Sequence, residues 1–177
     1  MSASPPASIP ARDQAQGRRW ARRISLALLA WTVALSIIGH WIVPDHRVVF
    51  SFTDSLPAHV WLVHLGQKPV RGDTIAFRIP KNRFYPHRYG GFLKIARGVA
   101  GDRVTREGRD FWIDGVFVGT AKEHSLRGLP LDPGPTGVLP PGHYFVWTPD
   151  VDSFDSRYAD IGWISQDRVV GVARPLF

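Results

Sequence analysis

The chain contains no cysteine. This excludes a disulfide scaffold, a metal site built from thiolates and a cysteine nucleophile. The seven histidines lie far apart, and none belongs to an HExxH or comparable ligand spacing, so we predict no metal site. A glycine-rich phosphate loop and a G-x-S-x-G elbow are also missing, and no local pattern supports a Ser-His-Asp triad. We therefore expect no cofactor.

Clustered positive charge is scarce outside the N-terminal tail. Of the formal net charge of +7, the first 23 residues carry +4, from five arginines against Asp13. Residues 24–43 are uncharged, so the remaining 134 residues carry +3 (7 − 4). Attachment to nucleic acid requires clustered cations, and we therefore predict no nucleic-acid partner.

The uncharged segment reads ISLALLAWTVALSIIGHWIV, residues 24–43. As a helix, a run of this length spans the roughly 30 Å hydrocarbon core of a bilayer. Trp20 and Trp41 stand near its ends, where interfacial aromatics are favoured, and Pro44 ends the helix. A cleaved signal peptide has a shorter apolar core and a small-residue cleavage site, which GHWIVPDH does not offer. A buried core helix would rarely be so long without a charge.

We therefore predict a single-pass anchor at 24–43 with the lipid bilayer as a partner. The arginines place the tail, residues 1–23, on the cytoplasmic side by the positive-inside rule. The tail is rich in Pro, Ser and Ala without periodicity, and we expect it to be disordered. The domain at 44–177 then lies on the opposite side of the membrane.

Beyond Pro44 the chain changes to short apolar runs separated by turn residues. The runs are RVVFSF, VWLVHL, TIAFRI, GFLKIA, FWIDG, VFVGT, HYFVW and VVGVA. Each has the length and composition of a strand, and no later stretch shows a sustained helical period. The sequence has 17 glycines and 15 prolines, which suits a loop-rich domain. We predict a mainly β fold, in which about 104–141 forms a hairpin and loop insert.

Lys94 stands inside one of these apolar runs, GFLKIA. Strand alternation places it on one face with Phe92 and Ala96. It could be an edge-strand lysine that discourages aggregation. Alternatively, burial could lower its pKa until the neutral amine accepts a proton from a serine hydroxyl.

Ser55 is the matching serine, in TDSLP, residues 53–57. By itself it is an ordinary turn residue. Its place shortly after the predicted anchor suits a substrate that also emerges from the bilayer. Thr53, two positions earlier, could direct its hydroxyl to the same side and donate to an oxyanion.

Three segments in this order resemble the membrane-bound type I signal peptidases, which use a Ser/Lys dyad. Ser55 with Pro57 matches the nucleophile motif, and Lys94 with the following Gly-x-x-Gly-Asp turn, ending at Asp102, matches the general-base strand. A Ser-x-Asp-Ser-Arg box follows at residues 153–157. The resemblance extends over most of the chain from the anchor onward.

The resemblance implies a role for each matched residue. Ser55 is the nucleophile and Lys94 the general base, while Ser153 orients the lysine. Asp155 and Arg157 form an ion pair behind the site. The Ser55 amide and the Thr53 hydroxyl make the oxyanion hole. It also implies a two-part β architecture, an inner-membrane location in a bacterium and a periplasmic catalytic domain.

The chain departs from the common pattern at three places. The nucleophile is followed directly by Leu56-Pro57, which is one residue tighter than the common spacing between the serine and the proline. Ala100 stands where the turn usually has a proline, and Thr148-Pro149-Asp150 replaces the usual Gly-Asp-Asn. The Ser-Leu-Pro form and single anchor are most like the TraF-type conjugative transfer signal peptidases. This implies a serine endopeptidase whose substrate is an exported, pilin-like precursor. The alternatives are a general housekeeping signal peptidase and a non-catalytic envelope scaffold.

Overall fold

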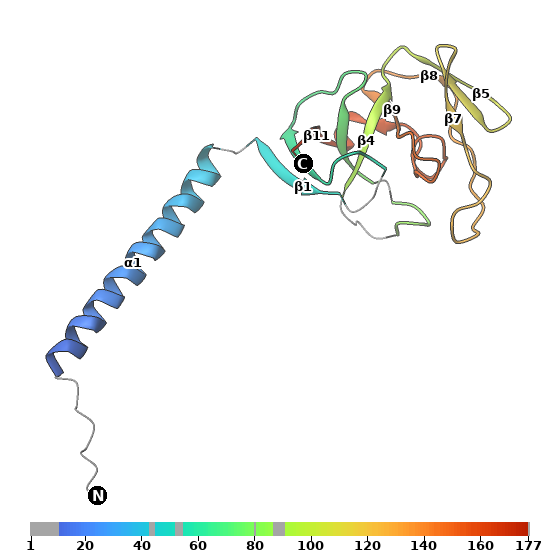
Figure 1. Cartoon of the computed structure of the whole chain (residues 1–177). Coiled ribbons are helices and arrows are strands. Elements are labelled where there is room, and N and C mark those ends of the chain that lie inside the picture. The colour runs from blue at the N-terminus through green and yellow to red at the C-terminus, as the bar shows by residue number, and fades with distance from the viewer. Residues whose placement is uncertain (1–10, 43–44, 52–54, 80, 87–90, 177) are drawn as a thin grey trace, which may run out of the picture. The chain divides into compact units, whose positions relative to one another are not determined.

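The computed structural model describes residues 11–42, 45–51, 55–79, 81–86 and 91–176. The chain divides into two compact units, residues 1–44 and 45–177 (Figure 1). Helix α1 (Ala11–Ile42) belongs to the first unit, and the described part of the second consists of strands, loops and one short 3-10 helix. The prediction of a mainly β fold is therefore confirmed.

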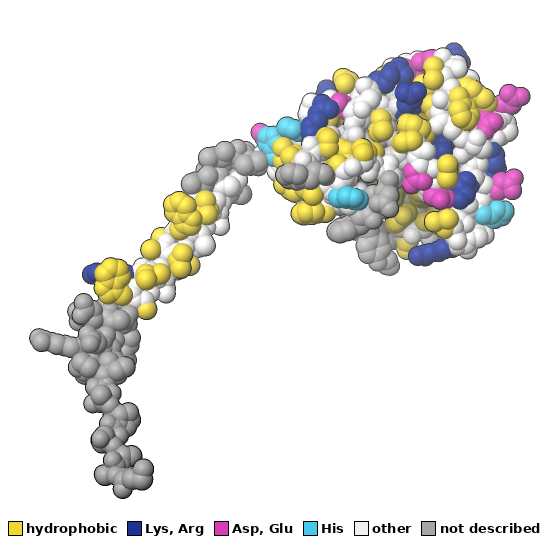
Figure 2. Space-filling view, in the orientation of Figure 1, with side chains coloured by type: hydrophobic (Ala, Val, Ile, Leu, Met, Phe, Trp, Pro, Cys, Tyr) yellow, Lys and Arg dark blue, Asp and Glu magenta, His cyan; other side chains and the backbone are white. Residues whose placement is uncertain are grey.

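Helix α1 covers nearly all of the predicted anchor segment and also includes residues 11–23 of the tail, for which the expectation of disorder is wrong. Hydrophobic side chains project along its described part (Figure 2), and the large ones are at least half exposed to solvent. Within the described residues, however, no helix is both long enough and apolar enough to cross a membrane. The anchor therefore stays a prediction.

The second unit contains a larger, seven-stranded antiparallel sheet in the order β1-β2-β11-β3-β4-β9-β10. Its strands are β1 (His46–Phe50), β2 (Val60–Leu65), β3 (Thr74–Arg78), β4 (Gly91–Gly98), β9 (His143–Trp147), β10 (Ile164–Ser165) and β11 (Val169–Pro175), and the 3-10 helix η1 (Gln166–Arg168) precedes β11. The C-terminal strand β11 inserts between β2 and β3 and pairs antiparallel with both, with a register shift against β3 between Val169 and Gly171. The last strand of the chain therefore lies in the interior of the sheet.

A smaller four-stranded sheet has the order β7-β6-β5-β8. Its strands are β5 (Arg103–Glu107), β6 (Asp110–Ile113), β7 (Val116–Thr120) and β8 (Gly137–Val138). Asp114 and Gly115 both adopt positive φ, 50° and 78°, in the turn between β6 and β7. This combination matches the right-handed twist of a two-residue hairpin. The small sheet therefore begins as a meander of tight hairpins.

Three groups of buried side chains hold the second unit together. The first joins the small sheet to β9 and includes Phe111, Leu139 and Phe145. A second lies on the large sheet around Phe77 and Val146. The third packs the loop before β2 against the sheet, and its members are Leu56, Ala58, Trp61, Val63, Ala76 and Ala173. That third group fixes the backbone that directly follows Ser55.

The eight predicted strand segments all coincide with strands, within two residues at nearly every end. The sequence did not indicate β5, because Val104 is its one buried residue and its other side chains are exposed. The two-residue strands β8 and β10 are too short to produce a pattern. Both exist because backbone groups of β5 and β9 pair with them.

Candidate active site

Ser55 lies in the loop between β1 and β2 and is 8% exposed. The following residues, Leu56 and Ala58, enter the third hydrophobic group. Trp61 Nε1 donates a hydrogen bond of 2.8 Å to the Ala58 carbonyl, and Ser51 N–H donates to the His59 carbonyl at 2.8 Å. The loop is thus fastened to β2 by apolar contacts and by backbone bonds. Thr53, the predicted second oxyanion donor, lies outside the described residues.

Lys94 lies on β4, in the interior of the large sheet. Its backbone pairs with Ile75 of β3, and the adjacent Ile95 pairs with Trp147 of β9. β9 pairs with β4 only from Ile95 onward. The Lys94 side chain is nevertheless buried and does not present its charge to solvent at a sheet edge, so that alternative is wrong. Its side chain is 7% exposed. A lysine buried here requires another explanation.

The Lys94 ammonium group contacts two side chains of the same region. Its Nζ donates a hydrogen bond of 2.8 Å to Ser153 Oγ, and it lies 5.7 Å from the centroid of the Phe92 ring. Ser153 is itself only 2% exposed. Two residues separated by 59 positions in the sequence therefore meet in a buried polar contact.

Burial lowers the pKa of Lys94 below its ordinary value. The carboxylates of Asp155 and Asp150 oppose this shift by favouring the ammonium form, while the Arg157 charge adds to it. The net direction is toward a neutral amine, because desolvation disfavours the charged form most strongly. A neutral amine in a buried position can accept a proton from a hydroxyl group.

Asp155 and Arg157 form a two-pronged ion pair next to this contact. Arg157 Nε donates to Asp155 Oδ1 at 2.9 Å and Nη2 to Oδ2 at 2.8 Å. The two side chains are 0% and 3% exposed. Arg157 also donates to the carbonyls of Thr120, Asp150 and Ser153 at 3.2–3.5 Å. The pair thereby ties the turn that carries Ser153 to the end of β7.

Ser156, inside the same box, attaches this segment to β9. Its Oγ accepts a hydrogen bond of 2.9 Å from Val146 N–H and donates one of 2.7 Å to the Gly162 carbonyl. Its own N–H donates to the Val146 carbonyl at 3.0 Å. The two serines of the box therefore have different contacts: Ser153 bonds the Lys94 side chain, whereas Ser156 bonds backbone groups.

A cavity of about 330 Å³ brings the predicted residues together. We call it the Ser55–Lys94 cavity. Its lining residues are Val49, Phe50, Ser51, Ser55, Tyr85, Gly91, Phe92, Leu93, Lys94, Asp150, Asp152, Ser153 and Phe154. Asp155 and Arg157 lie behind the wall that Ser153 forms. The structure thus brings the described members of the predicted set into one place.

Some residues of the cavity were not indicated by the sequence. Asp150, Asp152 and Phe154 lie beside Ser153 in the chain, so their closeness to the matched box was the available signal. Tyr85 carries no such signal, because it comes from an irregular segment far from either motif. Among the described residues, no cluster of three His, Asp or Glu side chains is placed to hold a metal ion.

The whole length after the tail matches a known family, described as "Signal peptidase, peptidase S26", over residues 18–177. The chain belongs to the peptidase S26 family. The resemblance inferred from the motifs is therefore confirmed, and the chain is a peptidase of the signal peptidase type.

Two relatives of this S26 peptidase are each called "Conjugal transfer protein TraF". That of Agrobacterium fabrum (strain C58 / ATCC 33970) is 29% identical over 167 residues, covering 85% of this chain and 89% of the relative. That of Agrobacterium tumefaciens (strain 15955) is 30% identical over 144 residues, covering 72% and 80%. Among solved structures, a signal peptidase I from Enterococcus faecalis V583 has 26% identity and a TM-score of 0.37, covering 60% of this chain and 97% of that one.

Proposed function

We propose that this S26 peptidase is a membrane-anchored serine endopeptidase that removes the signal or propeptide segment from an exported precursor. The observation that supports the proposal most directly is the buried Lys94–Ser153 contact in a cavity that Ser55 also lines. Burying a lysine there costs free energy, and a role of the neutral amine as the general base for Ser55 explains why a lysine occupies this position.

The proposed reaction begins when neutral Lys94 takes the proton of the Ser55 hydroxyl. The serine oxygen attacks the carbonyl carbon of the scissile peptide bond, and the resulting oxyanion is held by the Ser55 N–H and the Thr53 hydroxyl. Each such donor contributes about 3–4 kcal/mol to the transition state. Lys94 then gives the proton to the leaving amine, which departs and leaves an acyl-enzyme. Water hydrolyses the ester, with Lys94 again as the base.

A preference for small residues before the cleaved bond follows if the substrate lies extended along the start of β4. Gly91, Phe92 and Leu93 line the cavity next to Lys94. An added strand places alternate side chains toward the wall, and shallow pockets there accept small ones.

We further propose that the chain is anchored by residues 24–43, with its second unit in the periplasm. The support is the uncharged sequence of that segment, the arginines before it and the exposed apolar side chains of α1. A pilin-like substrate is supported by the similarity to the two relatives, which are named as conjugal transfer proteins.

The test is co-expression of the full chain with a candidate pilin precursor, followed by intact mass measurement. Wild type should shorten the precursor, while Ser55→Ala and Lys94→Ala should leave it intact. A further loss of the mass of one water would show that the product ends are joined, with a substrate amine replacing water. Cleavage by the Ser55→Ala variant would contradict the proposed nucleophile.

Cleavage of ordinary secretory precursors but not of the pilin would replace the proposed substrate with the housekeeping one. If wild type and Ser55→Ala behaved alike on both sets of precursors, the chain would instead act as a scaffold without catalysis. Each outcome thus selects one of the three candidate functions.

A further inference from the structure

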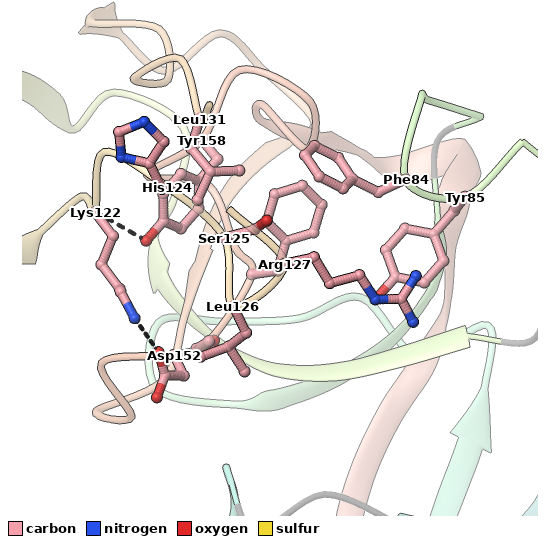
Figure 3. A pocket seen from close by; sticks show the side chains of 12 residues that line it. Phe84, Tyr85, Lys122, His124, Ser125, Leu126, Arg127, Leu131, Asp152 and Tyr158 are labelled. Atoms are coloured by element: carbon pink, nitrogen blue, oxygen red, sulfur yellow. Dashed lines mark hydrogen bonds and ion pairs between the residues drawn. The ribbon is translucent and has the colours of Figure 1, made fainter. Parts of the chain in front are cut away.

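A second cavity adjoins the proposed catalytic one. It encloses about 260 Å³ and is shown in Figure 3. We call it the 122–131 cavity, after the loop that supplies six of its twelve lining residues. Its lining residues are Phe84, Tyr85, Lys122, His124, Ser125, Leu126, Arg127, Leu131, Asp152, Ser153, Phe154 and Tyr158. No part of the mechanism above uses it.

The two cavities share one wall. Tyr85, Asp152, Ser153 and Phe154 line both. The strands β1 and β4 contribute to the Ser55–Lys94 cavity, whereas the described lining of the 122–131 cavity includes no residue from either strand. The second cavity therefore continues the first on the side of Ser153 that faces away from β1 and β4.

The direction of the substrate follows from the path of the proton. Lys94 Nζ takes the proton from Ser55 and must deliver it to the leaving nitrogen, so that nitrogen has to come within hydrogen-bonding distance of Nζ. Nζ lies 2.8 Å from Ser153 Oγ, and Ser153 is part of the shared wall. Because Ser153 also lines the 122–131 cavity, that cavity lies within reach of the chain that follows the cleaved bond.

The floor of this cavity is apolar and its rim is charged. Phe84, Leu131 and Tyr158 supply aromatic and aliphatic surface. The Phe84 ring meets the Phe154 ring edge to face, and the Tyr158 ring packs against Phe154 in a tilted arrangement. Lys122 at the rim is paired with Asp152, as Figure 3 shows. This pair fastens the loop to the segment that carries Ser153.

Arg127 is the unpaired cation of the rim. It is exposed, and among the described residues it makes no hydrogen bond or ion pair. Figure 3 shows its side chain extended across the mouth toward Tyr85. A substrate carboxylate would supply the negatively charged partner that Arg127 lacks among the described residues.

We propose that the 122–131 cavity binds the substrate segment downstream of the cleaved bond, taking a large apolar or aromatic side chain with a carboxylate beside it. The proposal rests on the proposed function, and it adds a determinant of specificity on the leaving-group side. Leu126 and Arg127 are the residues that determine the preference, through apolar contact and through charge respectively.

The test uses purified full chain in detergent and internally quenched peptides with alanines before the cleaved bond. The downstream segment carries Phe or Ala, and next to it Glu or Lys. Wild type should cleave the Phe peptides with a kcat/KM about tenfold higher than the Ala peptides, from burial of the ring. It should favour Glu over Lys by roughly two- to fivefold, the size expected for an exposed charge pair.

Two variants with matched controls assign these preferences to the cavity. Arg127→Glu should reverse the Glu-over-Lys preference, whereas Arg103→Glu, an exposed arginine on β5, should leave it unchanged. Leu126→Ala should reduce the Phe-over-Ala ratio, whereas Leu129→Ala, in the same loop but outside the lining, should not. Leu126 is 81% exposed, so its truncation does not threaten the fold.

The outcomes separate this inference from the proposed function. If the wild type cleaves none of the peptides, or only those that the Ser55→Ala variant also cleaves, the proposed function fails. If wild type cleaves but Arg127→Glu alters no downstream preference, the inference alone is overturned. A response to charges placed upstream of the bond, rather than downstream, would also overturn it, because the cavity would then hold the acyl segment.

Discussion

Two serines of one box should differ sharply in what they do, and this difference tests the proposed role of Lys94. Ser153 Oγ accepts the hydrogen bond of Lys94 Nζ, whereas Ser156 Oγ bonds only backbone groups of Val146 and Gly162. Both side chains are essentially inaccessible to solvent. Substituting each by alanine removes one hydroxyl and leaves the other interactions in place.

Ser153→Ala should act on the rate. A hydrogen bond to a charged or buried group is worth about 1.5–3 kcal/mol, which corresponds to roughly a ten- to hundredfold loss if the bond orients Lys94 in the transition state. The loss should fall on kcat with little change in KM, because the Ser153 hydroxyl is bonded to Lys94 Nζ and acts through the lysine. Ser153→Thr keeps the hydroxyl and should restore part of the rate.

Ser156→Ala should act on stability instead. It leaves the buried Val146 N–H without its acceptor, at a cost of about 1–3 kcal/mol in the free energy of unfolding. Activity measured well below the melting temperature should stay close to wild type. The assay pairs peptide cleavage kinetics with urea unfolding for each variant. Equal effects of the two variants on kcat, or a Ser153→Ala variant with wild-type kcat, would refute the assignment.

Further predictions concern charge, burial and backbone conformation. Because burial lowers the pKa of Lys94, kcat/KM should rise with pH through that lowered pKa, and Lys94→Arg should be inactive at every pH, since guanidinium stays protonated. The unfolded chain binds more protons at this lysine than the folded chain. Stability should therefore rise with pH up to the ordinary lysine pKa of about 10.4, a rise that Lys94→Met reduces in thermal melts. Asp155→Asn leaves the Arg157 charge buried without its partner and should cost about 3–5 kcal/mol in urea unfolding; a loss below that of an exposed pair would contradict the role of this pair. Gly101 adopts φ +93° with open space around it, so Gly101→Ala should cost about 1–2 kcal/mol from backbone strain alone, and an unchanged melting curve would show that the turn adapts.

The strands could be predicted because their alternation and turn residues are local. VWLVHL and HYFVW match β2 and β9 at both ends. Each is a short apolar run with a glycine at one end, Gly66 after β2 and Gly142 before β9. RVTRE, the sequence of β5, could not be predicted in the same way. Its pairing with β6 is specified by the partner strand and the tight turn, while most of its own side chains stay in solvent.

The sequence could predict residues of the candidate site only where a residue type was unusual for its surroundings. A lysine inside GFLKIA and a charged, serine-rich box near the C-terminus are such cases. The 122–131 cavity gave no such signal, because Phe84, Tyr85, Leu126 and Arg127 come from irregular segments without periodicity. These side chains meet only in the folded unit, where Lys122 of the loop after β7 also pairs with Asp152.

The sequence alone was enough to predict the fold class, the family and the residues capable of the proposed chemistry, because the strand pattern and the order of the motifs are local properties of the chain. Only the tertiary structure decided that β4 is an interior strand, that Lys94 is buried and that its amine meets Ser153. Those facts depend on which strands pair across long separations: the C-terminal β11 inserts between β2 and β3, and β9 pairs with the second half of β4. Desolvation of a lysine is a property of that assembly, since no local sequence can exclude water from its own side chain.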